Sequence, residues 1–360
     1  MKNKPTQTLN KQILNTLQLL KSLWEIKLIK ILLLILILLI TIPLSIFFII
    51  RPQPQKNINY GVNFSKKYTE QMKMDWKSTY LQIIDELKVR NIRLVAYWDD
   101  SEPNNNRYDF SDVTWQLDEA KKRNINVIMT VGYKVIRYPE CFEPEWVKSY
   151  STEERERELL EYVKTAVETL KGYDNIKIWQ VENEPFWPFG TCKISSRETI
   201  VKEINTVKML DNRPILVQDS GEGGFWFATY TLGDKLGISM YRKIWYDFWG
   251  LLFGKFIYFQ YPLAHWTYKI KADVMGIPYE NILVTELQAE PWGPGLNSDL
   301  PKEEIDKSMS HTYFIDTINY AQKGGFKDLY FWGPEWWLYM KQSRGDSFYW
   351  DTGKAILVNN

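Results

Sequence analysis

Two glutamates, Glu184 and Glu286, are the first candidates for chemistry in this sequence because each follows an apolar, strand-like segment. Glu184 lies in the stretch IWQVENEPF (178–186), where Pro185 stops the segment since it cannot donate to a strand ladder. Glu286 lies in VTELQAEPW (284–292), 102 residues further along the chain. Two carboxylates that face each other across a cleft have the chemistry for cleaving a glycosidic bond, one as acid and the other as nucleophile or base.

The elements that must hold these carboxylates alternate between short apolar runs and longer amphipathic helical patterns. Such alternation is typical of parallel βαβ units whose strands are covered on both faces. Eight units over residues 59–360 predict an α/β fold, a (β/α)8 TIM barrel. A doubly wound open sheet is the alternative, but the turn GVNFSKK lacks its glycine-rich pattern. The predicted strands span residues 58–64, 92–98, 126–133, 176–183, 214–220, 237–241, 281–287 and 328–333.

In this barrel Glu184 ends the fourth predicted strand and Glu286 ends the seventh. The carboxyl ends of barrel strands all face the active site, so both acids should lie at the same mouth. Glu182 would share a face with Glu184 only if strand alternation continued through Asn183. Because we expect the strand to break there, we assign Glu182 a structural role.

Further residues at predicted strand ends complete a pattern: Arg93 on strand two, Asn183 before Glu184, Tyr241 on strand six and Trp332 on strand eight. This pattern resembles the clan of retaining (β/α)8 glycoside hydrolases that includes many cellulases, mannanases and β-galactosidases. The similarity covers nearly all of the predicted barrel, including the segment YWDDSEPNNNRYDFSD after strand two.

The resemblance implies a role for each matched residue. Glu184 would be the acid/base and Glu286 the nucleophile of a retaining β-glycosidase. Asn183 would hold the sugar 2-hydroxyl, and Arg93 and Tyr241 would support the nucleophile. The implied substrate is an oligo- or polysaccharide, with no cofactor. A transglycosylase that uses the same site and a catalytically inactive carbohydrate-binding protein are the alternatives.

The segment after strand three and two tryptophans at strand ends complete the sequence-based site. Many members of the clan carry a histidine after strand three, where this chain reads VGYKVIRYPE (131–140), so Tyr133 or Lys134 takes that place. Trp332 would line the site at the end of strand eight. Trp98, after strand two, is predicted to bind substrate by stacking on a sugar, with packing against a neighbour as the alternative.

The N-terminal region reads as a membrane anchor. Residues 31–50 carry no charged side chain, and 20 apolar residues can cross a hydrocarbon core of about 30 Å. Six lysines precede them, so residues 1–30 are predicted to be a cytoplasmic tail of a single-pass cell-membrane protein. Residues 51–58 form a linker to an extracytoplasmic domain, 59–360. A cleaved signal peptide is the alternative, but its apolar core would be shorter and no Ala-x-Ala site follows.

Charge argues against a nucleic-acid partner. The first 51 residues hold seven Lys/Arg and one Glu, so subtracting their +6 from the total of +1 leaves the remainder near −5. A mildly acidic domain lacks the basic surface that binds phosphates. The partners predicted are therefore a saccharide and, through residues 31–50, the lipid bilayer.

The remaining polar and aromatic features give weaker indications. The two histidines, His265 and His311, lie far apart, and Cys141 and Cys192 lack ligand spacing, so we predict no metal site. The two cysteines either form one disulfide or remain thiols. The aromatic stretch 244–263 is either a folded flap over the cleft or an edge that touches lipid.

Overall fold

Two compact units make up the chain, residues 1–51 and 52–360. The computed structural model describes residues 14–18, 21–22, 27–49, 53–55, 57–193, 195–246 and 257–358. In the first unit, helix α2 (Lys27–Ile49) contains the predicted anchor except for residue 50, which lies outside the described residues. Within these ranges, no helix has both the length and the apolarity needed to cross a membrane. The anchor therefore stays a prediction.

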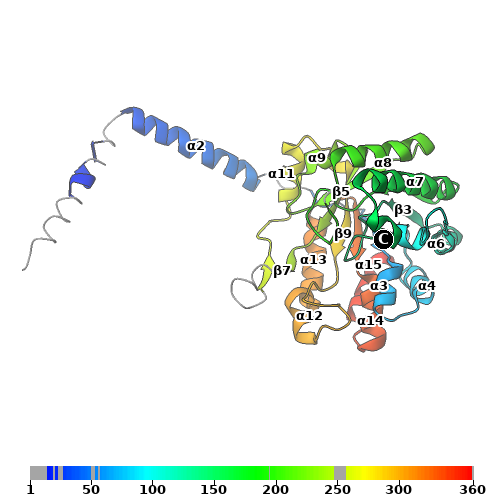
Figure 1. The fold of residues 1–360 in the computed structure, drawn as a ribbon. Helices are drawn as coiled ribbons and strands as arrows, with labels where there is room; N and C mark the ends of the chain where they lie inside the picture. Colours follow the sequence, from blue (N-terminus) through cyan, green and yellow to red (C-terminus); the bar gives the residue numbers. More distant parts are fainter. Residues whose placement is uncertain are drawn as a thin grey trace, which may run out of the picture. The chain divides into compact units, whose positions relative to one another are not determined.

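The second unit is built on a closed barrel of parallel strands with helices around it (Figure 1). The order around the barrel is β1-β2-β3-β4-β5-β6-β9-β10, and β10 pairs back with β1. This confirms the predicted (β/α)8 barrel, and every predicted strand overlaps an observed one. The strands are β1 (Asn59–Asn63), β2 (Asn91–Val95), β3 (Asn126–Val131), β4 (Ile176–Val181), β5 (Ile215–Ser220), β6 (Lys235–Met240), β9 (Ile282–Gln288) and β10 (Asp328–Trp332).

Burial on both faces explains why the strands are continuously apolar. Every residue of β5 and β9 is buried, since one face lines the barrel interior and the other is covered by helices. Polar residues inside such strands therefore have to find partners within the barrel.

The surrounding helices begin at capping residues that the sequence supplies. Ser151 and Glu154 form a capping box at the start of α7, which lies beside α8 (Figure 1). The helical pattern 304–323 is not one helix, because Ser310 separates α12 from α13 and accepts the N–H of Tyr313. The helices are α3 (Lys66–Gln71), α4 (Trp76–Glu86), α5 (Trp98–Ser101), α6 (Ser111–Lys122), α7 (Thr152–Leu170), α8 (Arg197–Leu210), α9 (Trp226–Tyr230), α11 (Thr267–Val274), α12 (Lys302–Met309), α13 (His311–Lys323), α14 (Pro334–Ser343) and α15 (Phe348–Val358).

Two features outside the barrel bear on its mouth. The aromatic stretch after β6 contains a hairpin in which β7 (Lys243–Tyr246) pairs antiparallel with β8 (Ile257–Gln260). Residues 247–256 lie outside the described residues, and both predictions for this stretch stay open. Cys141 and Cys192 form a disulfide with their Cα atoms 5.0 Å apart. It ties the loop after β3 to the loop after β4.

Candidate active site

Arg93 is the centre of a buried polar network at the carboxyl ends of the strands. Its side chain is fully buried, and Nε donates to Gln180 Oε1 at 2.7 Å. Nη1 donates to Glu286 Oε1 at 2.8 Å and to Asn63 Oδ1 at 3.1 Å. Nη2 donates to Asn183 Oδ1 at 2.7 Å. Arg93 thus holds together groups from β1 and β9 and from β4 and the residues just after it, including the predicted nucleophile.

Glu286 lies in an environment that stabilises negative charge. Besides Arg93, Gln218 donates to its Oε1 at 2.6 Å, and the hydroxyl of Tyr241 donates to its Oε2 at 3.2 Å. Burial, and then the charge of Glu286, raise the pKa of Tyr241 well above its usual value, so this phenol stays a neutral donor. Three hydrogen-bond donors thus converge on this one carboxylate.

Glu184 lies in an environment that favours its protonated form. Its side chain is 6% exposed, and the hydroxyl of Ser239 donates to its Oε1 at 2.6 Å. Burial raises the pKa of Glu184 well above its usual value, and the charges of Glu286 and Glu140 raise it further. The two carboxyls therefore have unequal surroundings, because burial and negative charge raise the pKa of Glu184 whereas three donors converge on Glu286, and such inequality suits an acid and a nucleophile.

The backbone at Glu184 is no longer a strand. Residues Glu182 and Glu184 have φ angles of +59° and +45°, so the expected break is present. The ammonium of Lys134 donates to the main-chain oxygens of Glu184 at 2.7 Å and Trp187 at 2.9 Å. The Glu182 carboxylate accepts the N–H groups of Tyr133 and Lys134. Glu182 therefore joins the loops after β3 and β4, and Lys134 positions Glu184.

Glu140 is a further buried carboxyl group, and the sequence analysis missed it. Asn183 Nδ2 donates to its Oε1 at 3.1 Å, and Lys134 Nζ lies 3.4 Å from its Oε2. Burial raises the pKa of Glu140 to about 8, against the opposing charge of Lys134. Its place in the loop after strand three was the only indication that the sequence offered.

Of the two tryptophans predicted to bind substrate, the structure places Trp332 at the mouth but not Trp98. Trp332 lies edge-to-face with Tyr241, with ring centres 6.3 Å apart. Trp98 is fully buried, stacks on Tyr162 at 5.4 Å and donates its indole N–H to Glu102 at 2.8 Å. The prediction that Trp98 binds substrate is therefore wrong. Its ring enters the layer between barrel and helices and has no free face.

Several functional neighbours were missed because they look like ordinary strand residues. Asn63, Gln180, Gln218 and Ser239 each contact Arg93 or one of the two catalytic candidates. The available signal was a polar side chain near the end of an apolar strand that is buried on both faces.

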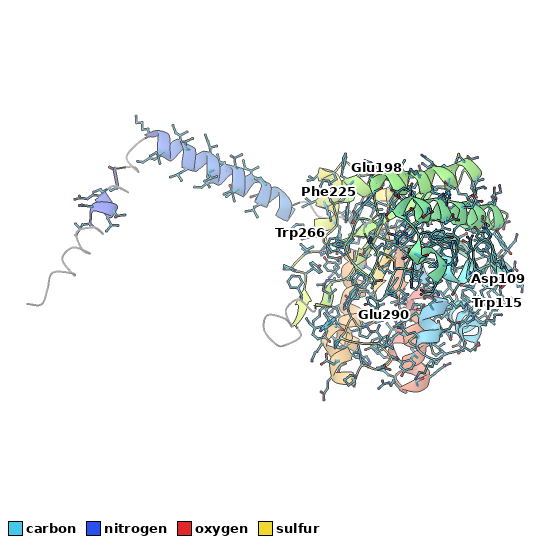
Figure 2. The ribbon with its side chains drawn as sticks, viewed as in Figure 1. Asp109, Trp115, Glu198, Phe225, Trp266 and Glu290 are labelled. Atoms are coloured by element: carbon cyan, nitrogen blue, oxygen red, sulfur yellow. A yellow bond between two sulfur atoms is a disulfide. The ribbon has the colours of Figure 1, made fainter. Side chains whose placement is uncertain are left out.

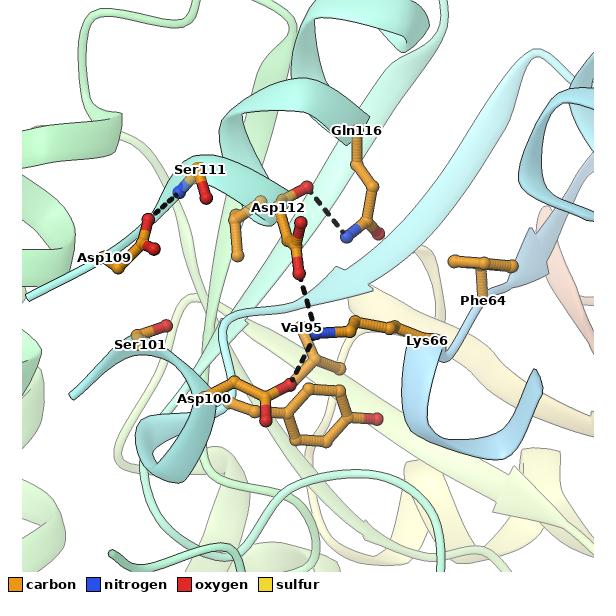
Figure 3. Close-up of a pocket in the computed structure, with 11 residues that line it drawn as sticks. Phe64, Lys66, Val95, Asp100, Ser101, Asp109, Ser111, Asp112 and Gln116 are labelled. Atoms are coloured by element: carbon orange, nitrogen blue, oxygen red, sulfur yellow. Dashed lines mark hydrogen bonds and ion pairs between the residues drawn. The ribbon is translucent and has the colours of Figure 1, made fainter. Parts of the chain in front are cut away.

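A separate cavity lies beyond the ends of β1 and β2 (Figure 3). Lys66 bonds Asp112 at 2.7 Å and Asp100 at 3.4 Å there, so its ammonium offsets part of the negative charge of the cavity. Neither Glu184 nor Glu286 lines it. In the part of the chain that the structure describes, no group of three or more His, Cys, Asp or Glu side chains is arranged to hold a metal ion.

The barrel is similar to solved structures, although no protein-family model and no curated protein matches the chain. The GH5_18 protein of Bifidobacterium longum subsp. longum is 15% identical with a TM-score of 0.54, covering 77% of this chain and 70% of its own. Xylanase 10B of Thermotoga petrophila is 17% identical with a TM-score of 0.50, covering 77% and 82%. The exo-β-1,4-mannosidase Op5Man5 of Opitutaceae bacterium strain TAV5 is 15% identical with a TM-score of 0.53, covering 76% and 51%. The chain thus shares the (β/α)8 fold of this glycoside hydrolase clan, as the sequence resemblance predicted.

Proposed function

We propose that this protein is a retaining β-glycosidase in which Glu286 is the nucleophile and Glu184 the acid/base. The observation that carries the proposal is the unequal surroundings of the two carboxyls. Glu286 receives three donors, including the guanidinium of Arg93, while burial and the charge of Glu286 keep a proton on Glu184.

In the first step, a Glu286 oxygen forms a bond to the anomeric carbon as the bond to the leaving oxygen breaks. Oε2 is the freer oxygen, since its donor Tyr241 is 3.2 Å away, whereas Oε1 has two closer donors. The proton of Glu184 passes to the leaving oxygen, so the aglycone departs as a neutral alcohol. Glu184 is then a carboxylate, and the sugar is an ester of Glu286.

In the second step, Glu184 takes a proton from water, and the water oxygen attacks the anomeric carbon. The ester bond to Glu286 breaks, which restores its carboxylate and the starting protonation of both groups. Two displacements at one carbon return the original anomeric configuration. Lys134 supports both steps by holding the main chain of Glu184 in place.

Turnover of aryl glycosides by the full chain, purified in detergent, tests the proposal. The 4-nitrophenyl β-glycosides of mannose, xylose, glucose and galactose cover the sugars suggested by the names of the similar structures and by the sequence resemblance. We expect nitrophenol release from at least one of them, with the β-anomer of the sugar as first product in NMR. If none of them is turned over, the alternative of a catalytically inactive carbohydrate-binding protein is left. Transfer of the sugar to an added alcohol in place of water would indicate a transglycosylase.

We further propose that residues 31–50 anchor the protein in the cell membrane with the barrel outside. The support is sequence alone: 20 residues without a charge, preceded by six lysines.

A further inference from the structure

The loop after β3 crosses the mouth of the barrel. In the strand order, β3 and β9 lie four strands apart in either direction, so they are opposite one another. Arg137, in the loop after β3, nevertheless forms an ion pair with Glu290, which follows β9 and is labelled in Figure 2. Its Nη2 also bonds Glu335 of α14 at 3.1 Å. The loop therefore spans the mouth from one side to the other.

The crossing loop packs against aromatic residues on one side of the mouth. Val135 and Ile136 are fully buried and pack in one cluster with Tyr97 and Trp332. The hydroxyl of Tyr97 donates to the main-chain oxygen of Ile136 at 3.3 Å. The guanidinium of Arg137 lies 4.0 Å from the centre of the Trp332 ring. The loop thus packs beside the ends of β10 and β2.

Fixed contacts hold this loop at its foot as well as at its tip. The disulfide joins Cys141 to Cys192, and Thr191 N–H donates to the main-chain oxygen of Pro139 at 3.0 Å. Arg137 is held at the tip between the rings of Tyr68, at 3.7 Å, and Trp332. A loop anchored at both ends forms a wall of the site.

The wall lies on the side where the glycone of a substrate must extend. Glu184 protonates the leaving oxygen, so the leaving group lies toward β4. Strand β10 is opposite β4 in the barrel, and it carries Trp332. The sugar that becomes attached to Glu286 would therefore point toward the side of the mouth that the loop occupies.

Resting on the proposed function, we infer that this protein is an exo-glycosidase, in which the loop 133–142 leaves room for a single glycone sugar. The site would remove one sugar at a time from the non-reducing end of a β-linked oligosaccharide. Arg137 and Glu290 would bind hydroxyls of that terminal sugar.

Two unpartnered atoms support the binding role of these side chains. Among the described residues, neither Nε of Arg137 nor Oε2 of Glu290 has a hydrogen-bond partner, and each side chain is only 6% exposed. A buried polar group without a partner is costly and calls for an explanation. A buried donor and a buried acceptor without partners suit the hydroxyls of a sugar, because each hydroxyl both accepts and donates.

The position of the first cut tests the inference. The substrate is the 4-nitrophenyl glycoside of a β-1,4-linked disaccharide of the sugar preferred in the aryl panel. Chromatography should show monosaccharide as the first product, with nitrophenol after a lag, and a 4-O-methyl cap on the terminal sugar should prevent both. Early release of intact disaccharide and nitrophenol would overturn the inference while leaving the glycosidase proposal intact. Inactivity on every aryl glycoside would contradict both the exo inference and the glycosidase proposal.

A matched pair of variants tests Arg137 itself. Arg137 has φ +80° and the exposed Lys88 has φ +54°, so Arg137→Gly and Lys88→Gly each remove a cation at a backbone angle that glycine accepts. Loss of charge-assisted hydrogen bonds to the terminal sugar should lower kcat/KM of Arg137→Gly on the aryl monoglycoside about 10- to 100-fold. Lys88→Gly should stay within about twofold of the parent protein. Equal activity of the two variants would contradict the role of Arg137, and the parent protein's product pattern decides the exo inference even if Arg137→Gly does not fold.

Discussion

Arg93 and Glu286 form an ion pair at 2.8 Å in the barrel mouth, with Arg93 fully buried and the Glu286 side chain 5% exposed. Removing one partner of such a pair leaves an uncompensated buried charge, which costs about 3–5 kcal/mol. Arg93→Met should therefore lower the free energy of unfolding at neutral pH by about that amount, measured by urea denaturation.

A second substitution checks the origin of this loss. Adding Glu286→Gln to Arg93→Met removes the stranded charge, so the double variant should recover at least about 1 kcal/mol relative to Arg93→Met alone. If the two substitutions simply add, the ion pair does not account for the stability of the mouth.

The sequence was sufficient to predict the barrel because parallel strands covered on both faces carry runs of apolar residues. The runs ILVQDS and ILVTELQ, at β5 and β9, are buried at every position, and that requirement is visible in any single strand. The spacing of Glu184 and Glu286 then followed from the repeat of βα units. The structure places both at the mouth, close enough for the charge of Glu286 to raise the pKa of Glu184.

Contacts that depend on a long loop could not be predicted from the sequence. Arg137 reaches Glu290 across 153 positions of the chain, and no periodic pattern marks such a crossing. Trp98 shows a second limit, since a tryptophan after a strand can turn toward the mouth or toward the helices. Here an indole hydrogen bond to Glu102 and stacking on Tyr162 hold the Trp98 ring on the side of the helices.

Attachment to membranes is a separate prediction, based on residues 31–50. Carbonate washing of membranes from expressing cells should leave the full chain in the pellet, and protease added to intact cells should digest the barrel but spare the tail. Replacing both Leu34 and Leu38 by arginine should weaken insertion, because each charge near the bilayer centre costs about 2.5–3.5 kcal/mol. A mature N-terminus near residue 52 would instead establish the signal-peptide alternative.

Stability should fall as pH rises from about 5 to 8. Burial raises the pKa of Glu140 from 4.5 to about 8, and those of Glu182 and Glu335 from 4.5 to about 7. Above pH 4.5 the unfolded chain releases these protons while the folded protein keeps them. The stabilisation is therefore complete below that pH and is lost as pH rises through the folded values.

Urea denaturation across this pH range measures the effect. Glu140→Gln keeps the shape of the side chain but cannot ionise, so its unfolding free energy should depend less on pH than that of the parent protein. Glu168→Gln, at an exposed position on α7, is the matched control and should leave the slope unchanged. A slope that Glu140→Gln does not alter would show that this carboxyl does not titrate in the range.

Replacing the proposed nucleophile should affect all substrates alike. Glu286→Ala removes the attacking oxygen and also leaves Arg93 without its carboxylate partner. Nitrophenyl and dinitrophenyl glycosides should therefore lose turnover to a similar extent. Glu286→Gln keeps the volume of the side chain and serves as the folding control, with a melting temperature that should be higher than that of Glu286→Ala.

Replacing the proposed acid/base should discriminate between substrates. General acid catalysis contributes about 10²–10⁴-fold, but only where the leaving group needs a proton. Glu184→Ala should thus slow cleavage of an oligosaccharide severely and spare the first step with a dinitrophenyl glycoside. The second step lacks its base, so the glycosyl ester should accumulate on Glu286, where mass spectrometry of the peptide would find it. Azide needs no base and should restore turnover, giving the β-glycosyl azide. If instead Glu286→Ala gave the β-azide and Glu184→Ala formed no adduct, the two roles would be reversed.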